Sequence, residues 1–253
     1  MPQIHLIDGE KGGVGKSFFA RTLVYYLNLK KLSFHLVDSD RSNPDVASRY
    51  PDRSQTVFFS EVEKKANDVD VIFNLSLEKP VIVNLPSQIE VVVTNWIERN
   101  GLAGDDLGKE YGLEIYKWFC CTGAHDSNTL FIESALKFKG RVKHVLVKNQ
   151  AFSDEDDWKQ IFQDYPQLEQ LINEQKIPQL VLPRLGTAEK NVIDQKQWTF
   201  DHAGSKDNKE FSALPKQRVV NYLRSLTTNL DELGILTAES FKTHSAKPKK
   251  PAA

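Results

Sequence analysis

Short apolar runs recur along the chain, and most of them do not alternate with polar residues. Runs of this kind are typical of strands that helices cover on both faces, as in a parallel sheet. We expect strands at residues 4–7, 34–37, 81–85, 118–121, 144–147 and 180–182. A weaker apolar run at residues 71–73 is interpreted as a further strand of the same sheet.

Between these runs, apolar positions recur at helical spacing. Helices are predicted at residues 16–29, 92–99, 128–138, 155–165, 168–175 and 219–233. Because strands and helices alternate, the sequence predicts an α/β fold: a doubly wound, mostly parallel sheet with helices on both faces.

Composition favours one domain. The chain has 253 residues, of which 40% are hydrophobic and 26% charged, so it can bury a sizeable core. No low-complexity linker divides it, and we assign residues 1–240 to a single domain. Residues 241–253 carry four lysines, two prolines and no acidic residue, which predicts a basic, disordered tail.

Charge and targeting signals argue against a strongly basic nucleic-acid-binding protein, a membrane-spanning protein and a secreted protein. The formal net charge of -1 gives no overall bias toward nucleic acid or anionic membranes. No apolar run is long enough for a transmembrane helix, and residues 1–5 contain no signal-peptide n-region. Cys120 and Cys121 are too few for a disulfide framework, so we expect a reducing cytoplasm and two small buried strand residues.

The chemical signal lies directly after the first predicted strand, where residues 9–17 read GEKGGVGKS and lead into a helix. Glycines at this place let successive backbone N–H groups surround phosphate oxygens. In such a phosphate-binding loop, or P-loop, Lys16 reaches the β- and γ-phosphates and the Ser17 hydroxyl binds Mg²⁺. We therefore predict ATP and Mg²⁺ as cofactors, since a mere glycine-rich turn does not account for the strand and helix on either side. The predicted nucleotide-binding residues here are Gly12, Gly13, Val14, Gly15, Lys16, Ser17 and Phe18.

Lys11 extends this pattern, because a lysine before the two glycines is not needed to form the loop. The stretch KGGVGKS resembles the deviant Walker A motif of the ParA/MinD superfamily of P-loop ATPases. The resemblance implies that Lys11 reaches across a nucleotide-dependent homodimer to the partner's phosphates, and that Lys11 and Lys16 are both catalytic. The alternative is that Lys11 is a solvated loop lysine.

Two aspartates follow the second predicted strand. Asp38 and Asp40 stand where the carboxyl end of a parallel strand faces the ligand crevice. They resemble the switch I acids of the same superfamily, which implies that Asp40 orients the attacking water and that Asp38 supports Mg²⁺ through its waters. The alternative is a helix-capping or turn role in the polar segment that follows.

Asn84 departs from the superfamily, which usually has aspartate at this position. We place Asn84 in the metal site with Ser17 and Asp38. An amide oxygen can accept a hydrogen bond from a metal-bound water but brings no charge. Losing a carboxylate about 5 Å from the ion weakens metal binding by a few kcal/mol, so we expect a slow ATPase.

Later segments resemble the superfamily less continuously. Asn149 follows one predicted strand, and Pro183 and Arg184 follow the next; the resemblance places all three near the adenine, although ordinary strand-end turns are the alternative. Short stretches at residues 121–123, 147–149 and 198–201 resemble the TraL and MobD-like branch, whose members are encoded in conjugation and mobilisation operons.

The function that this resemblance implies is a dimerising ATPase switch in plasmid transfer, mobilisation, partition or cargo positioning, with an adaptor protein as partner. Nonspecific DNA is a further possible partner, through Lys216, Arg218 and Arg224, unless these only cover a solvated helix face. The alternative function is a nucleotide-bound scaffold that hydrolyses little because of Asn84. A metabolic enzyme such as an amidoligase is a less favoured function, because the sequence shows no second catalytic constellation for a small-molecule substrate. We expect no membrane anchor, because the last helix carries Asp231 and Glu232 and few basic residues.

Overall fold

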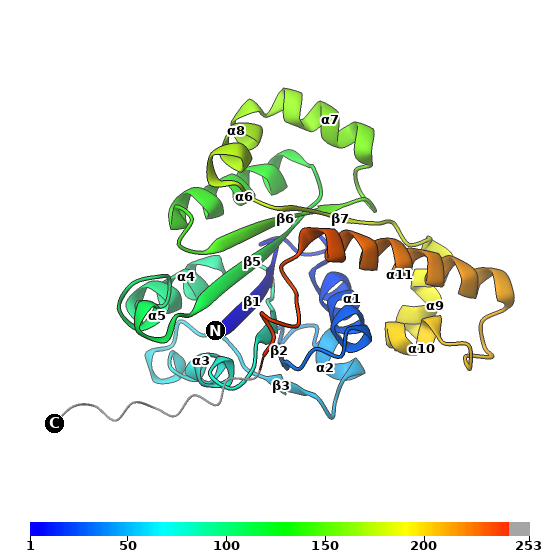
Figure 1. The fold of residues 1–253 in the computed structure, drawn as a ribbon, viewed down its shortest axis with the longest axis horizontal. Helices are drawn as coiled ribbons and strands as arrows, with labels where there is room; N and C mark the ends of the chain where they lie inside the picture. Colours follow the sequence, from blue (N-terminus) through cyan, green and yellow to red (C-terminus); the bar gives the residue numbers. More distant parts are fainter. Residues whose placement is uncertain (243–253) are drawn as a thin grey trace.

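The computed structural model describes residues 1–242, in which seven strands form one sheet with the order β3-β2-β4-β1-β5-β6-β7 (Figure 1). The pairs between neighbouring strands are all parallel, which confirms the predicted fold class. The strands are β1 (Gln3–Asp8), β2 (His35–Asp38), β3 (Ser54–Thr56), β4 (Val81–Asn84), β5 (Glu114–Cys121), β6 (Lys143–Asn149) and β7 (Gln179–Leu182).

Helices cover both faces of this sheet, because neighbouring residues of a strand point to opposite sides. On β1, Ile7 packs with α1 and α11, whereas Leu6 packs with α3 and α4 on the other face. A third cluster joins β5 and β6 to α6, α7 and α8. The helices are α1 (Lys16–Leu29), α2 (Asp45–Arg49), α3 (Asp70–Ser76), α4 (Glu90–Arg99), α5 (Asp106–Tyr111), α6 (His125–Phe138), α7 (Glu155–Asp164), α8 (Pro166–Gln175), α9 (Thr187–Gln195), α10 (Phe200–Gly204) and α11 (Ala213–Leu233), with a 3₁₀ turn η1 (Glu63–Lys65).

The strand predicted at residues 71–73 is wrong, since this segment lies inside α3. A short apolar run does not distinguish a strand from a buried helix by itself. Here the chain has to cross from β3 to β4, which runs parallel to β2, and a crossover of that kind uses a helix. The polar edge strand β3 and the helices α2, α5, α9 and α10 were not predicted either.

The chain that follows α11 returns to the sheet. Phe241, the first residue of the predicted tail, is buried and its ring stacks on His5 at 5.6 Å between centroids. Packing therefore continues past residue 240, and the rest of the predicted tail from residue 243 lies outside the described residues. Within residues 1–242, none of the helices combines the length and apolarity needed to span a bilayer.

His5 is buried completely in the middle of β1. The Trp118 Nε1–H donates to His5 Nδ1 at 3.1 Å, and His5 Nε2 lies 3.2 Å from Gln3 Oε1. Because an indole N–H can only donate, His5 Nδ1 must be unprotonated and the ring neutral. Burial lowers the pKa of His5 to about 3.

This buried imidazole predicts acid sensitivity. The unfolded chain takes up the proton near pH 6.5 but the folded chain does not, so stability is lost as the pH falls below about 6.5. We expect His5 to account for about 2 kcal/mol of the loss between pH 8 and pH 5. Urea unfolding at the two pH values measures this difference, which should shrink by that amount in His5→Gln. The exposed His125→Gln is the control, and an equal difference in His5→Gln and the parent would contradict the prediction.

Candidate functional site

The predicted P-loop connects Asp8, at the end of β1, to Lys16, at the start of α1. Gly15 has a φ of 102°, in the left-handed region that favours glycine. A Cβ atom at this position would also lie 2.5 Å from Asn149 Nδ2. Glycine is therefore required here both by the turn and by the close approach of Asn149.

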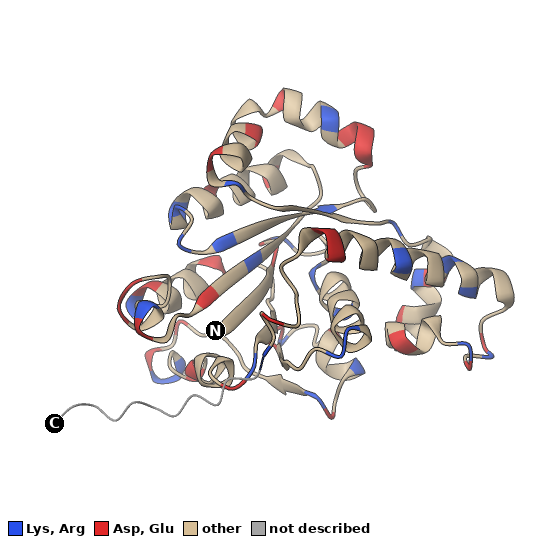
Figure 2. Ribbon diagram, in the orientation of Figure 1, with Lys and Arg blue, Asp and Glu red and all other residues tan. Residues whose placement is uncertain are grey.

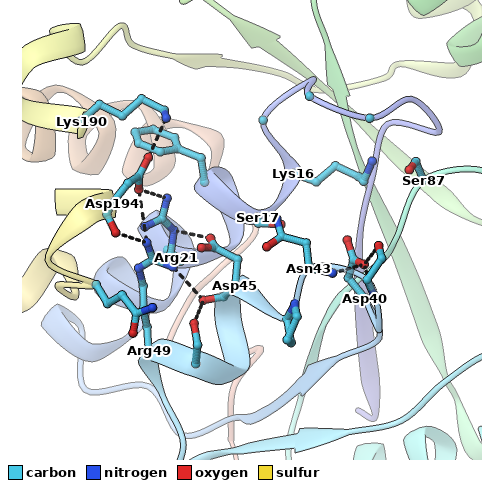
Figure 3. Close-up of a pocket in the computed structure, with 18 residues that line it drawn as sticks. Lys16, Ser17, Arg21, Asp40, Asn43, Asp45, Arg49, Ser87, Lys190 and Asp194 are labelled. Carbon is cyan, nitrogen blue, oxygen red and sulfur yellow. Dashed lines mark hydrogen bonds and ion pairs between the residues drawn. The ribbon is translucent and has the colours of Figure 1, made fainter. Parts of the chain in front are cut away.

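A cavity of about 750 Å³ opens over this loop at the carboxyl edge of the sheet (Figure 3). Lys16, Ser17 and Phe18 line it together with the glycines at positions 12, 13 and 15, and Asp40 belongs to its wall. The Lys16 ammonium donates to the Lys11 carbonyl at 2.6 Å, and burial lowers the pKa of Lys16. Most of the residues predicted to bind the nucleotide thus share one cavity.

The three predicted metal-site residues converge beside the loop. Asn84 pairs with Asp38 on one side and with Ile7 on the other, because β4 lies between β2 and β1. The Asn84 amide donates to Asp38 Oδ1 at 3.0 Å and lies 3.3 Å from Ser17 Oγ. Asn84 Oδ1 is buried and has no hydrogen-bond partner among residues 1–242. A hydroxyl and an unpartnered carbonyl oxygen fit a hard cation such as Mg²⁺.

Asp38 has the capping role that the sequence left open. Its Oδ2 accepts hydrogen bonds from the backbone N–H groups of Val46 and Ala47 at 3.0 and 2.8 Å, in the first turn of α2. Its Oδ1 accepts from the Asp40 N–H at 3.2 Å as well as from Asn84. Burial raises the pKa of Asp38, although these hydrogen bonds oppose the shift.

Asp40 has the turn role that was the alternative for this pair. Its Oδ1 accepts from the Ser42 N–H and hydroxyl at 3.0 and 2.7 Å and from the Asn43 N–H at 3.0 Å. Asp40 also lines the cavity, together with residues of the P-loop. Both aspartates therefore shape the backbone next to the site.

Lys11 lies at the rim of the site. Its side chain is 44% exposed, and its ammonium forms an ion pair with Asp126 in the first turn of α6. The carbonyl of Lys11 accepts from Lys16, whereas its side chain points to α6. The side chains of the two motif lysines therefore lie in different places: Lys16 lines the cavity, and Lys11 contacts α6.

None of the three residues predicted near the adenine lines the cavity. Asn149 is buried, and its Nδ2 donates to the Val14 carbonyl at 2.9 Å, so it supports the P-loop from β6. Pro183 and Arg184 follow β7 and do not line the cavity, and Arg184 is exposed.

A cluster of ion pairs forms the opposite wall of the cavity and was not predicted (Figure 3). Arg21 of α1 binds Asp45 of α2 at 3.0 Å and Asp194 of α9 at 2.9 Å. Asp194 also pairs with Lys190 at 2.6 Å, and Arg49 pairs with Asp45. One signal was present in the sequence: an arginine on the otherwise apolar face of α1.

The three basic residues proposed to contact DNA lie along α11, whose C-terminal end carries acidic side chains (Figure 2). Arg218 is paired with the buried Glu189 of α9 at 2.6 Å. Lys216 donates to a backbone carbonyl at 3.3 Å, and Arg224 is exposed. Arg218 therefore has a structural partner.

Comparisons with known proteins give one partial sequence match and similarities to solved structures. No protein-family model matches the chain. The protein MobD of Acidithiobacillus ferrooxidans is 39% identical over 84 residues, which are 32% of this chain and 36% of MobD, so the match spans about a third of that relative. A Borrelia burgdorferi plasmid partition protein bound to AMPPNP has a TM-score of 0.55 at 15% identity, over 93% of this chain and 99% of that one. A ParA family ATPase of Chlorobium tepidum has a TM-score of 0.49 at 14% identity, over 88% and 99% of the two chains.

The chain therefore has the same α/β fold as the Borrelia burgdorferi plasmid partition protein, and its phosphate loop resembles the deviant Walker A motif of the ParA/MinD superfamily.

Proposed function

We propose that the protein binds ATP with Mg²⁺ and acts as a dimerising ATPase switch in plasmid mobilisation, transfer or partition. The observation that carries the proposal is the cavity above a glycine loop that Lys16 and Ser17 line together, with Asn84 directly beside Ser17. Asn84 also has a buried side-chain oxygen without a hydrogen-bond partner among the described residues. The Borrelia relative, which has the same fold, was solved with an ATP analogue.

Each residue has a chemical task in this proposal. The loop N–H groups and the Lys16 ammonium bind the phosphates, because cations and backbone donors stabilise anionic oxygens. Ser17 and Asn84 would hold Mg²⁺, which when bound supplies charge to the phosphoryl oxygens, and Asp38 keeps the Asn84 amide oriented. Asp40 orients the attacking water from across the cavity.

Replacing Lys16 should remove nucleotide binding. The variant Lys16→Ala loses the ammonium that faces the phosphates, and we expect ATP affinity to fall about 100-fold or more. Isothermal titration calorimetry with Mg²⁺·ATP measures the effect. Lys109→Ala, on the surface of α5, is the matched control and should bind like the parent. Undiminished affinity in Lys16→Ala would overturn the assignment of the site.

Dimerisation should depend on ATP and on Lys11. Two triphosphates that face each other repel, and a lysine given to each by the partner offsets the repulsion. In an Asp40→Ala background, where hydrolysis is slowed, light scattering should show a dimer with ATP and a monomer without it. Adding Lys11→Ala should leave a monomer in both conditions, whereas adding Lys109→Ala should leave the dimer intact. A monomer in the Asp40→Ala protein with ATP would contradict the proposal.

The similarity to MobD supports mobilisation as the process that the switch serves. Within the proposal, an adaptor protein reads the nucleotide state, and DNA binds nonspecifically through exposed basic residues. Arg224 is the best placed of the three proposed residues, because Arg218 is held by Glu189.

A second candidate function is a nucleotide-bound scaffold with little hydrolysis. The contact between Asn84 and Asp38 favours it, because both Asp38 oxygens are engaged and the amide adds no charge to the metal site. Steady-state turnover with and without DNA separates the two functions: a switch is stimulated by its partner or DNA, whereas a scaffold stays slow in both conditions.

The variant Asn84→Asp tests this interpretation of the metal site. Without metal, a second carboxylate beside Asp38 replaces a hydrogen bond by repulsion, so the melting temperature should fall by several degrees. With Mg²⁺·ATP the added charge faces the cation, so the stabilisation by ligand should exceed that of the parent. Differential scanning calorimetry measures both, and Asn95→Asp on the exposed side of α4 is the control. An unchanged melting temperature without ligand would show that Asn84 does not hold Asp38.

A further inference from the structure

A buried ion pair lies between the sheet and α6, outside the residues that the motif identifies. Asp8 Oδ2 at the end of β1 is 2.9 Å from Lys117 Nζ on β5, and each side chain is only 1% exposed. Both residues face the same side of the sheet, because β1 and β5 pair in register with Leu6 opposite Lys117. Burying two charges costs free energy that their attraction does not always return, so stability alone is a weak reason for this pair.

Hydrogen bonds continue from Lys117 and fix its orientation. Lys117 Nζ donates to Ser134 Oγ of α6 at 2.9 Å, and Ser134 Oγ lies 3.0 Å from His144 Nε2 of β6. His144 Nδ1 lies 3.1 Å from the Val142 carbonyl, an acceptor, so Nδ1 carries the proton and Nε2 accepts from Ser134. Ser134 thus accepts from the Lys117 ammonium and donates to His144, and these contacts hold Lys117 in place beside Asp8.

The other oxygen of Asp8 controls the first residues of the P-loop. Asp8 Oδ1 accepts from the Gly9 N–H at 2.6 Å and from the Glu10 N–H at 3.1 Å. Glu10 has a φ of 49°, which is uncommon for a residue with a side chain. The carboxylate therefore helps to hold a strained backbone that leads into the phosphate-binding glycines.

The same carboxylate is an electrostatic problem for a phosphate site. Asp8 lies close enough to Lys16 that its charge raises the pKa of that lysine, against the larger lowering by burial. An uncompensated anion at this place would repel the phosphates through a poorly screened interior. Lys117, which is buried and pairs with Asp8 outside the cavity, supplies the compensating charge.

We propose that Lys117 is a positioning residue for phosphate binding: it holds Asp8 so that one oxygen fixes the Gly9 and Glu10 amides, and it cancels the charge of Asp8 beneath the phosphates. This inference rests on the proposed nucleotide-binding function. Lys117 does not reach the cavity itself and acts through Asp8.

Two double variants separate this role from packing. Asp8→Asn/Lys117→Met removes both charges but keeps an oxygen that accepts from Gly9 and Glu10, so Mg²⁺·ATP affinity should stay within about threefold of the parent. Asp8→Leu/Lys117→Met replaces the pair by apolar side chains and removes that oxygen, and affinity should fall about tenfold or more. Because an apolar pair of similar volume is often tolerated, the second variant is expected to fold. The single variant Lys117→Met, with an unpaired Asp8, should bind ATP more weakly than Asp8→Asn/Lys117→Met.

Amide hydrogen exchange without nucleotide gives a second readout, which a purely structural role would not change at these positions alone. The Gly9 and Glu10 amides should exchange faster in Asp8→Leu/Lys117→Met than in the parent and in the asparagine variant. Lys143→Met is the matched control, because Lys143 pairs with Glu114 at the exposed, opposite end of the neighbouring strand and should alter neither readout.

Parent-like ATP affinity or parent-like exchange in Asp8→Leu/Lys117→Met would overturn the inference, and so would equally weak binding by the two double variants. Absence of ATP binding by the parent would instead refute the proposed function, while the exchange measurement would still report whether Asp8 holds the two amides. If Lys117→Met does not fold, Lys117→Gln, which removes the charge but can still donate to Asp8, takes its place in the comparison with Asp8→Asn/Lys117→Met. Equal ATP affinity of these two proteins would overturn the role of the Lys117 charge.

Discussion

The position of β4 between β1 and β2 is the constraint on which the site depends. Parallel pairing in this register places the ends of the three strands at one height, with Asn84 beside Ile7 on one side and Asp38 on the other. The P-loop starts two residues beyond Ile7, so Ser17, Asn84 and Asp38 come within hydrogen-bond distance without any long side chain. A shift of one residue in either pair would turn Asn84 or Asp38 toward the opposite face of the sheet.

Side chains at the ends of β1 and β6 then support the phosphate loop. Asn149 on β6 holds the Val14 carbonyl, while Asp8 on β1 holds the Gly9 and Glu10 amides. In both contacts the side chain belongs to a residue outside the glycine motif. The loop therefore depends on polar groups of the sheet for its shape, and the glycines supply only the backbone freedom that this shape requires.

The features that could be predicted from the sequence are those that a short stretch of the chain specifies. The P-loop, six of the seven strands and the long helices follow from periodicity and from one motif, because each is specified within a short window. The strand predicted at residues 71–73 failed because its few apolar residues fit either structure, and the crossover to β4 decided for a helix. The polar β3 has no apolar signal, since an edge strand of three residues is specified by its neighbour β2.

Contacts between distant segments could not be predicted from the sequence. The carboxylate of Asp38 could cap a helix or support a metal ion, and only the position of α2 shows that it caps Val46 and Ala47. Lys117, Ser134 and His144 stand on different elements, and no spacing in the sequence brings them together. An arginine on an apolar helix face, as at Arg21 on α1, indicates that an acidic partner is nearby. Only the fold shows that this partner is Asp194.

The pairing of Arg21 with Asp194 joins residues that are 173 positions apart in the chain. During synthesis the P-loop and β2 leave the ribosome long before α9 does, and domains acquire non-local contacts late. A nascent chain that stops before residue 187 contains the complete GEKGGVGKS loop but lacks one wall of the cavity. Its two buried arginines, Arg21 and Arg49, have only Asp45 as a carboxylate partner from this cluster until α9 arrives. Completion of the cavity thus marks a late stage of folding, after the phosphate loop itself has been made.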